Sequence, residues 1–394
     1  MFTYKTFNNI AEDGLAVMAS KNISDVPENP DALILRSHKL LATEFGNNLS
    51  AIARAGAGVN NIPIKDATDI GVVVFNTPGA NANAVKELVI CGMLLSSRGI
   101  VDGINFAKNL DSSDTDVLNK MLEAQKKTFA GNELAGKTIG IVGLGAIGSM
   151  LAQASQALGM KLVGFDPHIS IDSAWRLPRE VKKAETLEDL LKQSDYVSLH
   201  VPLVEATKNL INASNLKYFK SDARLINLSR GGIVNSNDVI QALENGQLSK
   251  FVTDFPTPEL IERSAKHNDV ILLPHMGAST KEAEVNCAVM AANQIANFLH
   301  RGVIINSVNF PNVSLERSTP YRLVIITKNE PGMISKITDS IASLNLNIAE
   351  MSNKSRDEIA INLIDLEHEA SDELVSQLKS IEHVLKVRSI NTAS

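Results

Sequence analysis

Three glycines with the spacing GxGxxG lie in the stretch GIVGLGAIGSM, where Gly143, Gly145 and Gly148 separate an apolar run, KTIGIV, from a helical pattern, SMLAQASQALG. In such a strand–turn–helix context the first glycine allows a tight turn, the second lets a pyrophosphate approach the backbone, and the third lets helix and strand pack closely. Asp166 ends the next apolar run, KLVGFD, 18 residues beyond Gly148. A carboxylate there can accept hydrogen bonds from ribose hydroxyls. The stretch therefore predicts a dinucleotide-binding α/β unit.

The acidic residue also predicts which dinucleotide binds. Asp166 would repel a 2′-phosphate, which favours NAD over NADP as cofactor. Ala146 and Ile147 lie within the glycine-rich turn and are expected to contact the cofactor with the glycines. The alternative is a glycine-rich turn with a structural role only.

Short apolar runs alternate with helical or turn-rich segments over about the first 275 residues. Near-continuous apolar runs of this kind are typical of parallel strands covered on both faces. The runs ALILRS, AIARAGAG and VVVFNTPG come first, followed later by KTIGIV, KLVGFD, YVSLHVPL, RLINLS, KFVTDF and VILLPH. We therefore predict an α/β protein with two doubly wound (Rossmann/flavodoxin-like) parallel-sheet domains.

Two helical patterns connect these domains. One begins at an N-cap, Asn81 or Asn83, and the other runs over KEAEVNCAVMAANQIANFLHRG and could return to the first domain. A linker-like stretch at 306–320 precedes a small third domain, in which strand, helix, strand, helix and strand patterns follow one another. We predict a substrate-binding domain at 1–87 and 285–312, a dinucleotide-binding domain at 88–284 and a third domain at 320–394.

Composition excludes several classes of protein. With 44% hydrophobic and 21% charged residues, the chain is expected to fold throughout. A net charge of −6 without a Lys/Arg-dense run argues against nucleic acid or an anionic membrane as partner. Cys91 and Cys287 are too few for a disulfide framework, the start MFTYKTFNNI lacks the apolar core of a signal peptide, and no run is long enough to span a membrane. We expect a cytoplasmic protein, and no metal site is predicted.

Polar residues at the ends of three predicted strands are candidates for catalysis. Hydride transfer to or from a carbon that bears oxygen needs a proton donor or acceptor and a cation for the oxygen. Arg230 follows RLINLS, Asp254 and Glu259 follow KFVT, and His275 follows VILLP. A nearby carboxylate would stabilise the imidazolium form of His275, and the Arg230 guanidinium could hold a substrate carboxylate. Alternatively, Arg230 and Glu259 form a plain ion pair and His275 is a hydrogen-bonded turn residue.

Five motifs in order, GLGAIG, FDP, HVPL, NLSRGGIVN and PHMGAST, resemble those of the D-2-hydroxyacid dehydrogenase family over residues 1 to about 312. The resemblance implies a catalytic set of Arg230, Glu259 and His275, with Asp254 at the nicotinamide amide. The family usually has D-x-F-x-x-E-P where this chain has DFPTPEL, although Glu259 keeps its place five residues after Asp254. Further cofactor contacts are expected at Val201, Pro202, Leu228, Ser229, Gly277 and Ala278.

The stretches LRS, RAGAGVNN and NTPGANANAVKEL resemble the branch of this family that oxidises 3-phospho-D-glycerate to 3-phosphohydroxypyruvate with NAD, the first step of serine biosynthesis. Arg36 and Arg54 are then the candidates for the substrate phosphate, together with Ser37. Backbone amides near Ala57 and Gly58 would hold the carboxylate. The alternative is a solvated basic edge of the sheet.

The last 75 residues resemble an ACT domain, a βαββαβ module that commonly pairs side by side and binds amino acids. The matching pieces are KNEPGMIS and NLNIAEM. The resemblance implies a serine effector at Asn329 and Asn347, with Thr327 where relatives often have a histidine. A module that only dimerises is the alternative. Either implies at least a homodimer, with a homotetramer also open.

Three other functions remain open on the sequence. The chain could be another member of the same family, such as a hydroxypyruvate or glyoxylate reductase. It could be a nonenzymatic NAD-responsive regulator, although a regulator need not retain Arg230, Glu259 and His275. It could also act chiefly as an amino-acid-binding module.

Overall fold

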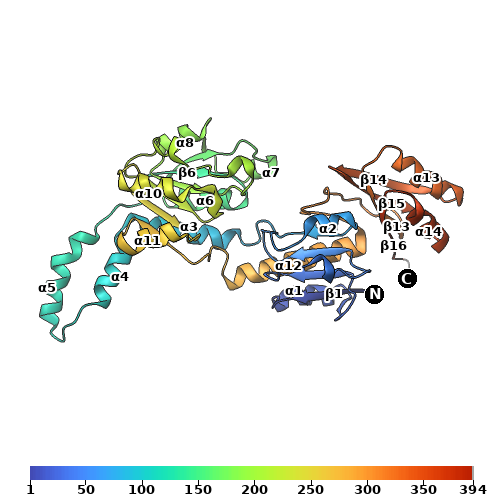
Figure 1. Ribbon diagram of the computed structural model, residues 1–394, viewed down its shortest axis with the longest axis horizontal. Coiled ribbons are helices and arrows are strands. Elements are labelled where there is room, and N and C mark those ends of the chain that lie inside the picture. The colour runs from blue at the N-terminus through green and yellow to red at the C-terminus, as the bar shows by residue number, and fades with distance from the viewer. Residues whose placement is uncertain (393–394) are drawn as a thin grey trace. The chain divides into compact units, whose positions relative to one another are not determined.

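The computed structural model describes residues 1–392 and consists of two compact units (Figure 1). Unit 1 joins Met1–Asn81 to Lys281–Ser394, and unit 2 is Ala82–Thr280. Each unit is described by itself. The three-domain division with boundaries at 87/88, 284/285 and near 320 stays a prediction.

Unit 1 contains a five-stranded parallel sheet in the order β2-β1-β3-β4-β5, which is the flavodoxin-like doubly wound order. The three predicted strands of this sheet are present and buried. The first strand of the chain was not predicted, because only one of its six side chains is buried and its sequence lacks a continuous apolar run. The strands are β1 (Phe2–Phe7), β2 (Ile23–Asp25), β3 (Ala32–Leu35), β4 (Ala51–Arg54) and β5 (Val73–Phe75).

Three helices accompany this sheet: α1 (Glu12–Ser20), α2 (Ile64–Asp69) and α12 (Lys281–Arg301). A 3₁₀ turn, η1 (Ala42–Glu44), follows β3. Helix α12 packs against α1 and β4, as the apolar face of its sequence predicts. It ends at Gly302, which adopts φ +71 and so provides the left-handed conformation that commonly terminates helices.

The last part of unit 1 is a four-stranded antiparallel sheet in the order β14-β15-β13-β16, with a βαββαβ chain order. Strand β14 is missing from the predicted strand patterns, because its residues IAEMSNKSR are mostly polar and none is buried. The elements are β13 (Tyr321–Lys328), α13 (Met333–Ser343), β14 (Ile348–Arg356), β15 (Ile359–Leu366), α14 (Asp372–Ser380) and β16 (Val384–Asn391).

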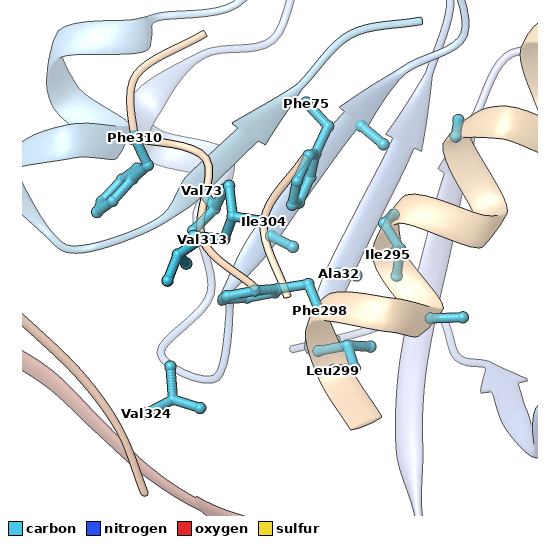
Figure 2. Close-up of a cluster of buried hydrophobic side chains, with 14 of the residues drawn as sticks. Ala32, Val73, Phe75, Ile295, Phe298, Leu299, Ile304, Phe310, Val313 and Val324 are labelled. Atoms are coloured by element: carbon cyan, nitrogen blue, oxygen red, sulfur yellow. The ribbon is translucent and has the colours of Figure 1, made fainter. Parts of the chain in front are cut away.

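This small sheet shares a hydrophobic core with the parallel sheet of unit 1. Figure 2 shows Phe75 and Phe298 beside Phe310 and Val313, with Val324 of β13 in the same cluster, and all five are at most 2% exposed. Residues 306–320, which the sequence suggested as a linker, are therefore packed into unit 1. The linker-like stretch is thus part of the core, because its apolar side chains pack there.

A buried ion pair fixes the same connection. The Arg322 and Asp365 side chains are both 0% exposed, and the Arg322 Nε atom lies 2.6 Å from the Asp365 carboxylate. The Arg322 guanidinium also donates to the carbonyl oxygens of Arg301, Leu315 and Glu316 at 2.9–3.3 Å. Because a buried charge is costly unless it is paired and hydrogen-bonded, these contacts hold the connecting segment in one conformation.

Unit 2 contains a seven-stranded parallel sheet in the order β12-β11-β10-β9-β6-β7-β8. The six predicted strands are confirmed, and two-residue β8 is added at one edge. The predicted α/β fold class, with parallel Rossmann-like sheets and a small C-terminal domain, is confirmed. The strands are β6 (Thr138–Val142), β7 (Lys161–Phe165), β8 (Lys182–Lys183), β9 (Tyr196–Leu199), β10 (Arg224–Asn227), β11 (Lys250–Thr253) and β12 (Val270–Leu272).

Helices connect these strands, and their N-termini lie near the carboxyl edge of the sheet. They are α6 (Ala146–Ala157), α7 (Ile171–Ala174), α8 (Leu187–Gln193), α9 (Ala213–Leu216), α10 (Ser236–Glu244) and α11 (Pro258–Lys266), with 3₁₀ turns η3 (Glu205–Thr207) and η4 (Gly231–Ile233).

A helical hairpin extends from the start of unit 2 in Figure 1. Helix α3 (Ala82–Ser97) leads into α4 (Ile100–Lys108) and α5 (Thr115–Gln125), followed by η2 (Lys126–Phe129). Large apolar side chains on the two hairpin helices are 37–49% exposed: Val101, Ile104, Val117, Met121 and Leu122. Within residues 1–392, none of the helices combines the length and the apolar character that crossing a membrane requires.

Candidate active site

The glycine loop between β6 and α6 has the geometry that a dinucleotide phosphate requires. Gly143 adopts φ +91, and a Cβ there would lie 2.8 Å from the His200 carbonyl group. A Cβ on Gly148 would lie 2.1 Å from the Gly143 carbonyl oxygen, so α6 and β6 approach each other at glycine. At Gly145 a Cβ would meet no described heavy atom within 4 Å. The second glycine therefore faces open space at a helix N-terminus, where a phosphate can bind.

Asp166 is joined to this loop by its own carboxylate. Its Oδ2 accepts a hydrogen bond from the Leu144 backbone amide at 2.8 Å, and its Oδ1 accepts one from the His168 amide at 2.9 Å. Each carboxylate oxygen has a second lone pair, so each can also accept a hydrogen bond from a ribose hydroxyl. Ala146 and Ile147, in the first turn of α6, are both partly exposed beside this loop.

Asp254, at the end of β11, has one carboxylate oxygen satisfied and one unsatisfied. Oδ2 accepts from the Gly277 amide at 2.9 Å, whereas Oδ1 is buried without a hydrogen-bond partner among residues 1–392. An unpaired buried acceptor costs roughly 1–3 kcal/mol, more when it is charged. The carboxamide N–H of a nicotinamide ring is a donor of the kind that Asp254 Oδ1 lacks. Ala278 follows Gly277 and is partly exposed.

The other predicted cofactor contacts lie after two central strands. Val201 and Pro202 follow β9, and Leu228 and Ser229 follow β10. The Ser229 hydroxyl donates to the Val201 carbonyl at 3.3 Å, which joins the two loops. Because β9 and β10 are adjacent parallel strands, these residues lie at the same carboxyl edge as the glycine loop.

His200 follows β9, and the sequence did not single it out as buried. Its Nε2 lies 2.8 Å from the Ser198 hydroxyl, and its Nδ1 is buried without a hydrogen-bond partner in the described residues. Burial lowers the pKa of His200 to about 4. The ring is therefore neutral at pH 7, and its backbone carbonyl packs against Gly143 of the phosphate loop.

His275 follows β12 in a left-handed backbone conformation, with φ +43. Its amide donates to the Asp254 carbonyl oxygen at 2.9 Å, and its ring centroid lies 4.9 Å from that of Phe255. The residue is exposed. Positive φ is uncommon outside glycine, and such residues are concentrated at functional sites. The backbone hydrogen bond thus fixes His275 relative to Asp254.

Arg230 and Glu259 are also exposed, after β10 and in the first turn of α11. The Arg230 Nη1 donates to the Ser229 carbonyl at 2.6 Å. Hydrogen bonds from the Glu259 backbone amide and the Thr257 side chain lower the pKa of Glu259. Within residues 1–392, no ion pair joins Glu259 to His275 or to Arg230, so the expected carboxylate–imidazole contact is not made here. Catalytic hydrogen bonds often form only with substrate bound, and the three roles stay predictions.

Arg36 and Arg54, the two residues predicted to bind the substrate phosphate, lie close together at the carboxyl edge of the unit 1 sheet. Arg54 ends β4, which pairs with β3 so that Leu35 lies beside it, and Arg36 is the next residue. The Arg54 Nε donates to the Arg36 carbonyl at 3.1 Å. The Arg36 Nη1 lies 2.5 Å from the Glu284 carboxylate, an ion pair that the sequence did not predict.

The remaining predicted substrate contacts lie in the same loops. The Ser37 amide donates to the Asn8 side chain at 3.0 Å, and Ala57 accepts from the Asn76 side chain at 2.7 Å. Gly58 is partly exposed. The Ser37 amide thus already has a protein partner.

Asn329 and Asn347 of the C-terminal domain are both exposed and tethered. The Asn329 side chain donates to the Asp357 carbonyl at 3.2 Å, and the Asn347 side chain donates to the Glu367 carboxylate at 2.9 Å. Thr327 is buried, and its hydroxyl has no hydrogen-bond partner within residues 1–392.

Comparison with known proteins decides the family. Residues 102–277 match the family model described as D-isomer specific 2-hydroxyacid dehydrogenase, NAD binding domain. The chain is also 35% identical over 327 residues to a D-3-phosphoglycerate dehydrogenase of Haemophilus influenzae, a match to 80% of this chain and 75% of that protein. The chain belongs to the D-isomer specific 2-hydroxyacid dehydrogenase family. The predicted family is thus confirmed, as is NAD as the cofactor.

Two further proteins are similar to the chain. For one, the match covers a smaller part of the relative's length, and for the other the similarity is one of fold. A D-3-phosphoglycerate dehydrogenase of Synechocystis sp. is 36% identical over 312 residues, or 77% of this chain, but the chain spans only 54% of that relative's length. A crystal structure of cofactor (NAD+) bound 3-phosphoglycerate dehydrogenase in Entamoeba histolytica matches with a TM-score of 0.60 at 24% identity, covering 78% of this chain and 98% of that chain. That similarity confirms the fold.

Proposed function

We propose that the chain is an NAD-dependent D-3-phosphoglycerate dehydrogenase, which oxidises the C2 hydroxyl of 3-phospho-D-glycerate to give 3-phosphohydroxypyruvate. The observation that carries the proposal is the pair of arginines, Arg36 and Arg54, at adjoining strand ends of unit 1. Guanidinium groups suit a phosphate because their fork of donors matches its oxygens. The proposal is supported by 35% and 36% identity to two proteins named D-3-phosphoglycerate dehydrogenase.

The residues of unit 2 have complementary roles in this proposal. When bound, NAD supplies the ring that accepts the hydride. The unsatisfied Asp254 Oδ1 accepts a hydrogen bond from the ring's amide, and His275 takes the proton of the C2 hydroxyl. Arg230 holds the substrate carboxylate and stabilises negative charge on the C2 oxygen. Once substrate brings the two groups together, the negative charge of Glu259 stabilises the imidazolium form of His275.

The test is steady-state reduction of 3-phosphohydroxypyruvate with NADH beside unphosphorylated hydroxypyruvate. Oxidation of an alcohol by NAD is unfavourable at neutral pH, so the reductive direction gives the clearer rates. We expect a large preference for the phosphorylated compound, and we expect Arg54→Gln to remove most of it without a comparable loss on hydroxypyruvate. Equal kcat/KM for both compounds would contradict the proposed substrate.

One observation favours a second candidate, a reductase of unphosphorylated hydroxyacids such as hydroxypyruvate or glyoxylate. Arg36 is already paired with Glu284, which reduces the positive charge available for a phosphate. The same two-substrate assay separates the candidates. If the unsubstituted protein binds NAD but reduces neither compound, the result would instead favour a nonenzymatic regulator.

We propose further that the C-terminal domain is an ACT domain that binds serine. Its βαββαβ order and four-stranded antiparallel sheet support this assignment, as do the two exposed asparagines, Asn329 and Asn347. L-Serine should raise the Tm of the full chain, and Asn347→Ala should abolish the shift. D-Serine serves as the control ligand. If serine shifts the Tm of the Asn329→Ala and Asn347→Ala variants as much as that of the unsubstituted protein, these residues are not the serine site.

A homo-oligomer, either a dimer or a tetramer, is proposed as the functional assembly. The exposed apolar side chains of α4 and α5 support it, because clustering of exposed apolar side chains is typical of interfaces. Light scattering after gel filtration measures the mass directly. A cytoplasmic location stays a prediction.

A further inference from the structure

The Arg36–Glu284 ion pair lies at a place where the proposed function needs a free cation. Glu284 is in the first turn of α12, whose N-terminus stabilises a carboxylate electrostatically. Its Oε1 lies 2.5 Å from the Arg36 Nη1, and both side chains are partly exposed, 39% for Arg36 and 46% for Glu284. The carboxylate thus occupies a face of the guanidinium that solvent, and a small anion, can reach.

A second observation shows that Glu284 belongs to a cluster with both arginines. Cys287 lies one helical turn after Glu284 and is 5% exposed. Burial raises the pKa of the Cys287 thiol and a hydrogen bond with Thr77 lowers it; more weakly, the charges of Arg36 and Arg54 lower it and that of Glu284 raises it. The two guanidinium groups and the carboxylate therefore act on one point in unit 1. Arg54 Nε donates to the Arg36 carbonyl, so both arginines lie at the same edge of the sheet, near Glu284.

We propose that Glu284 is a specificity-determining residue that competes with the substrate phosphate for Arg36. This inference rests on the proposed function. In the absence of phosphate the carboxylate neutralises and orients Arg36. A phosphate must break this ion pair and also lie near a negative charge, and both effects weaken its binding. Because partly exposed ion pairs are worth little, the competition reduces phosphate affinity without abolishing it.

The competition sets how strongly the enzyme prefers a phosphorylated substrate. An unphosphorylated hydroxyacid leaves the Arg36–Glu284 pair intact and is not opposed by it. Glu284 therefore narrows the difference in affinity between the two classes of substrate. It also favours release of a phosphorylated product, since the carboxylate replaces the departing phosphate at Arg36.

The substitution Glu284→Gln tests this role, because the amide has nearly the same shape but no charge. We expect the ratio of KM for hydroxypyruvate to KM for 3-phosphohydroxypyruvate to rise threefold to tenfold, or about 0.6–1.4 kcal/mol, through KM for the phosphorylated compound. The matched control is Glu282→Gln, which removes an exposed carboxylate from the same turn of α12. That control should leave both KM values unchanged.

Binding of inorganic phosphate separates failure of this inference from failure of the proposed function. Glu284→Gln should bind inorganic phosphate threefold to tenfold more tightly than the unsubstituted protein in calorimetric titration, whether or not the protein turns over 3-phosphohydroxypyruvate. Unchanged phosphate affinity, or a parallel rise in both KM values with a lowered Tm, would overturn the inference and leave a structural ion pair. If phosphate affinity rises but wild-type activity shows no preference for the phosphorylated substrate, the inference stands and the proposed substrate falls.

Discussion

The carboxyl edges of the two parallel sheets differ in how their polar groups are satisfied. In unit 2, Asp254 Oδ1 and His200 Nδ1 are buried without a hydrogen-bond partner in the described residues. In unit 1, Arg36 is paired with Glu284, and its carbonyl accepts from Arg54 and Asn61. The two unit 2 groups thus lack partners until a ligand supplies them, whereas the Arg36 side chain of unit 1 already has a partner that a ligand must replace. Under the proposed function, this difference predicts a cofactor site with unpaired groups in unit 2 and a substrate site with internal competition in unit 1.

The largest expected effect comes from the proposed proton acceptor of unit 2. His275→Asn should lower kcat by about 10²–10⁴-fold, the usual range for loss of general acid–base catalysis, and leave the Kd of NAD nearly unchanged. Asparagine is the suitable replacement because His275 has φ +43 and asparagine tolerates this backbone. His267→Asn, at the end of α11, is the matched control and should have wild-type kcat. A collapse of NAD affinity in His275→Asn would make the residue structural.

The second effect concerns stability and pH. The pKa of His200 is about 4 in the folded protein and about 6.5 in the unfolded chain, so between these values the unfolded state binds one more proton. Stability contributed by neutral His200 is therefore present above pH 6.5 and is lost as pH falls to 4, by up to about 3 kcal/mol. Urea unfolding of unit 2, followed at pH 7, 6, 5 and 4.5, measures the loss. His200→Gln should flatten the dependence, and an unchanged slope would assign it to other groups.

A third prediction tests the unsatisfied carboxylate. Asp254→Asn keeps an oxygen for the Gly277 amide but replaces the buried charge by a neutral group. NAD should bind about 10–100-fold more weakly, because a hydrogen bond to a charged acceptor is worth about 1.5–3 kcal/mol. The Tm of the ligand-free protein should not fall. A lowered Tm with unchanged NAD affinity would mean that the carboxylate stabilises the turn and does not contact the cofactor.

The smallest effect is expected at the ribose contact. Asp166→Asn can retain the hydrogen bond from the Leu144 amide while it removes the negative charge. The ratio of kcat/KM for NAD over NADP should fall about tenfold, since the repulsion of a 2′-phosphate is lost. Comparison of the two cofactors at equal ionic strength provides the measurement. An unchanged ratio would contradict the assignment of Asp166 to the ribose.

The sequence predicted those strands and site residues whose signal is local. All four residues of β3, β9 and β10 are buried. Adjacent apolar side chains within each strand mark it, and the residues that follow mark the site. Strand β14 is mostly exposed and β1 has only one buried side chain, so both escaped this criterion. The glycine loop was predictable because its three glycines lie within six residues, and Gly143 and Gly148 each have a steric cause there.

Contacts between distant parts of the chain could not be predicted in this way. Glu284 meets Arg36 across 248 positions of sequence, and only the return of α12 to the first sheet brings them together. The unpaired Nδ1 of His200 depends on packing around it, which no spacing in the sequence encodes. Such features follow from tertiary structure and therefore require coordinates.

The shared core of unit 1 has a consequence for any attempt to divide the chain. Phe298 and Val324 pack in one cluster (Figure 2). Arg388 of β16 donates to the Leu299 carbonyl at 2.7 Å. A peptide bond cut within 306–320 would thus leave two fragments that remain associated through apolar surface and hydrogen bonds. A truncated chain that ends before β13, by contrast, would present that surface to water and tend to aggregate. The C-terminal sheet and the parallel sheet of unit 1 share one core. Experiments that separate them should therefore use a chain cut within 306–320 in preference to a truncated chain.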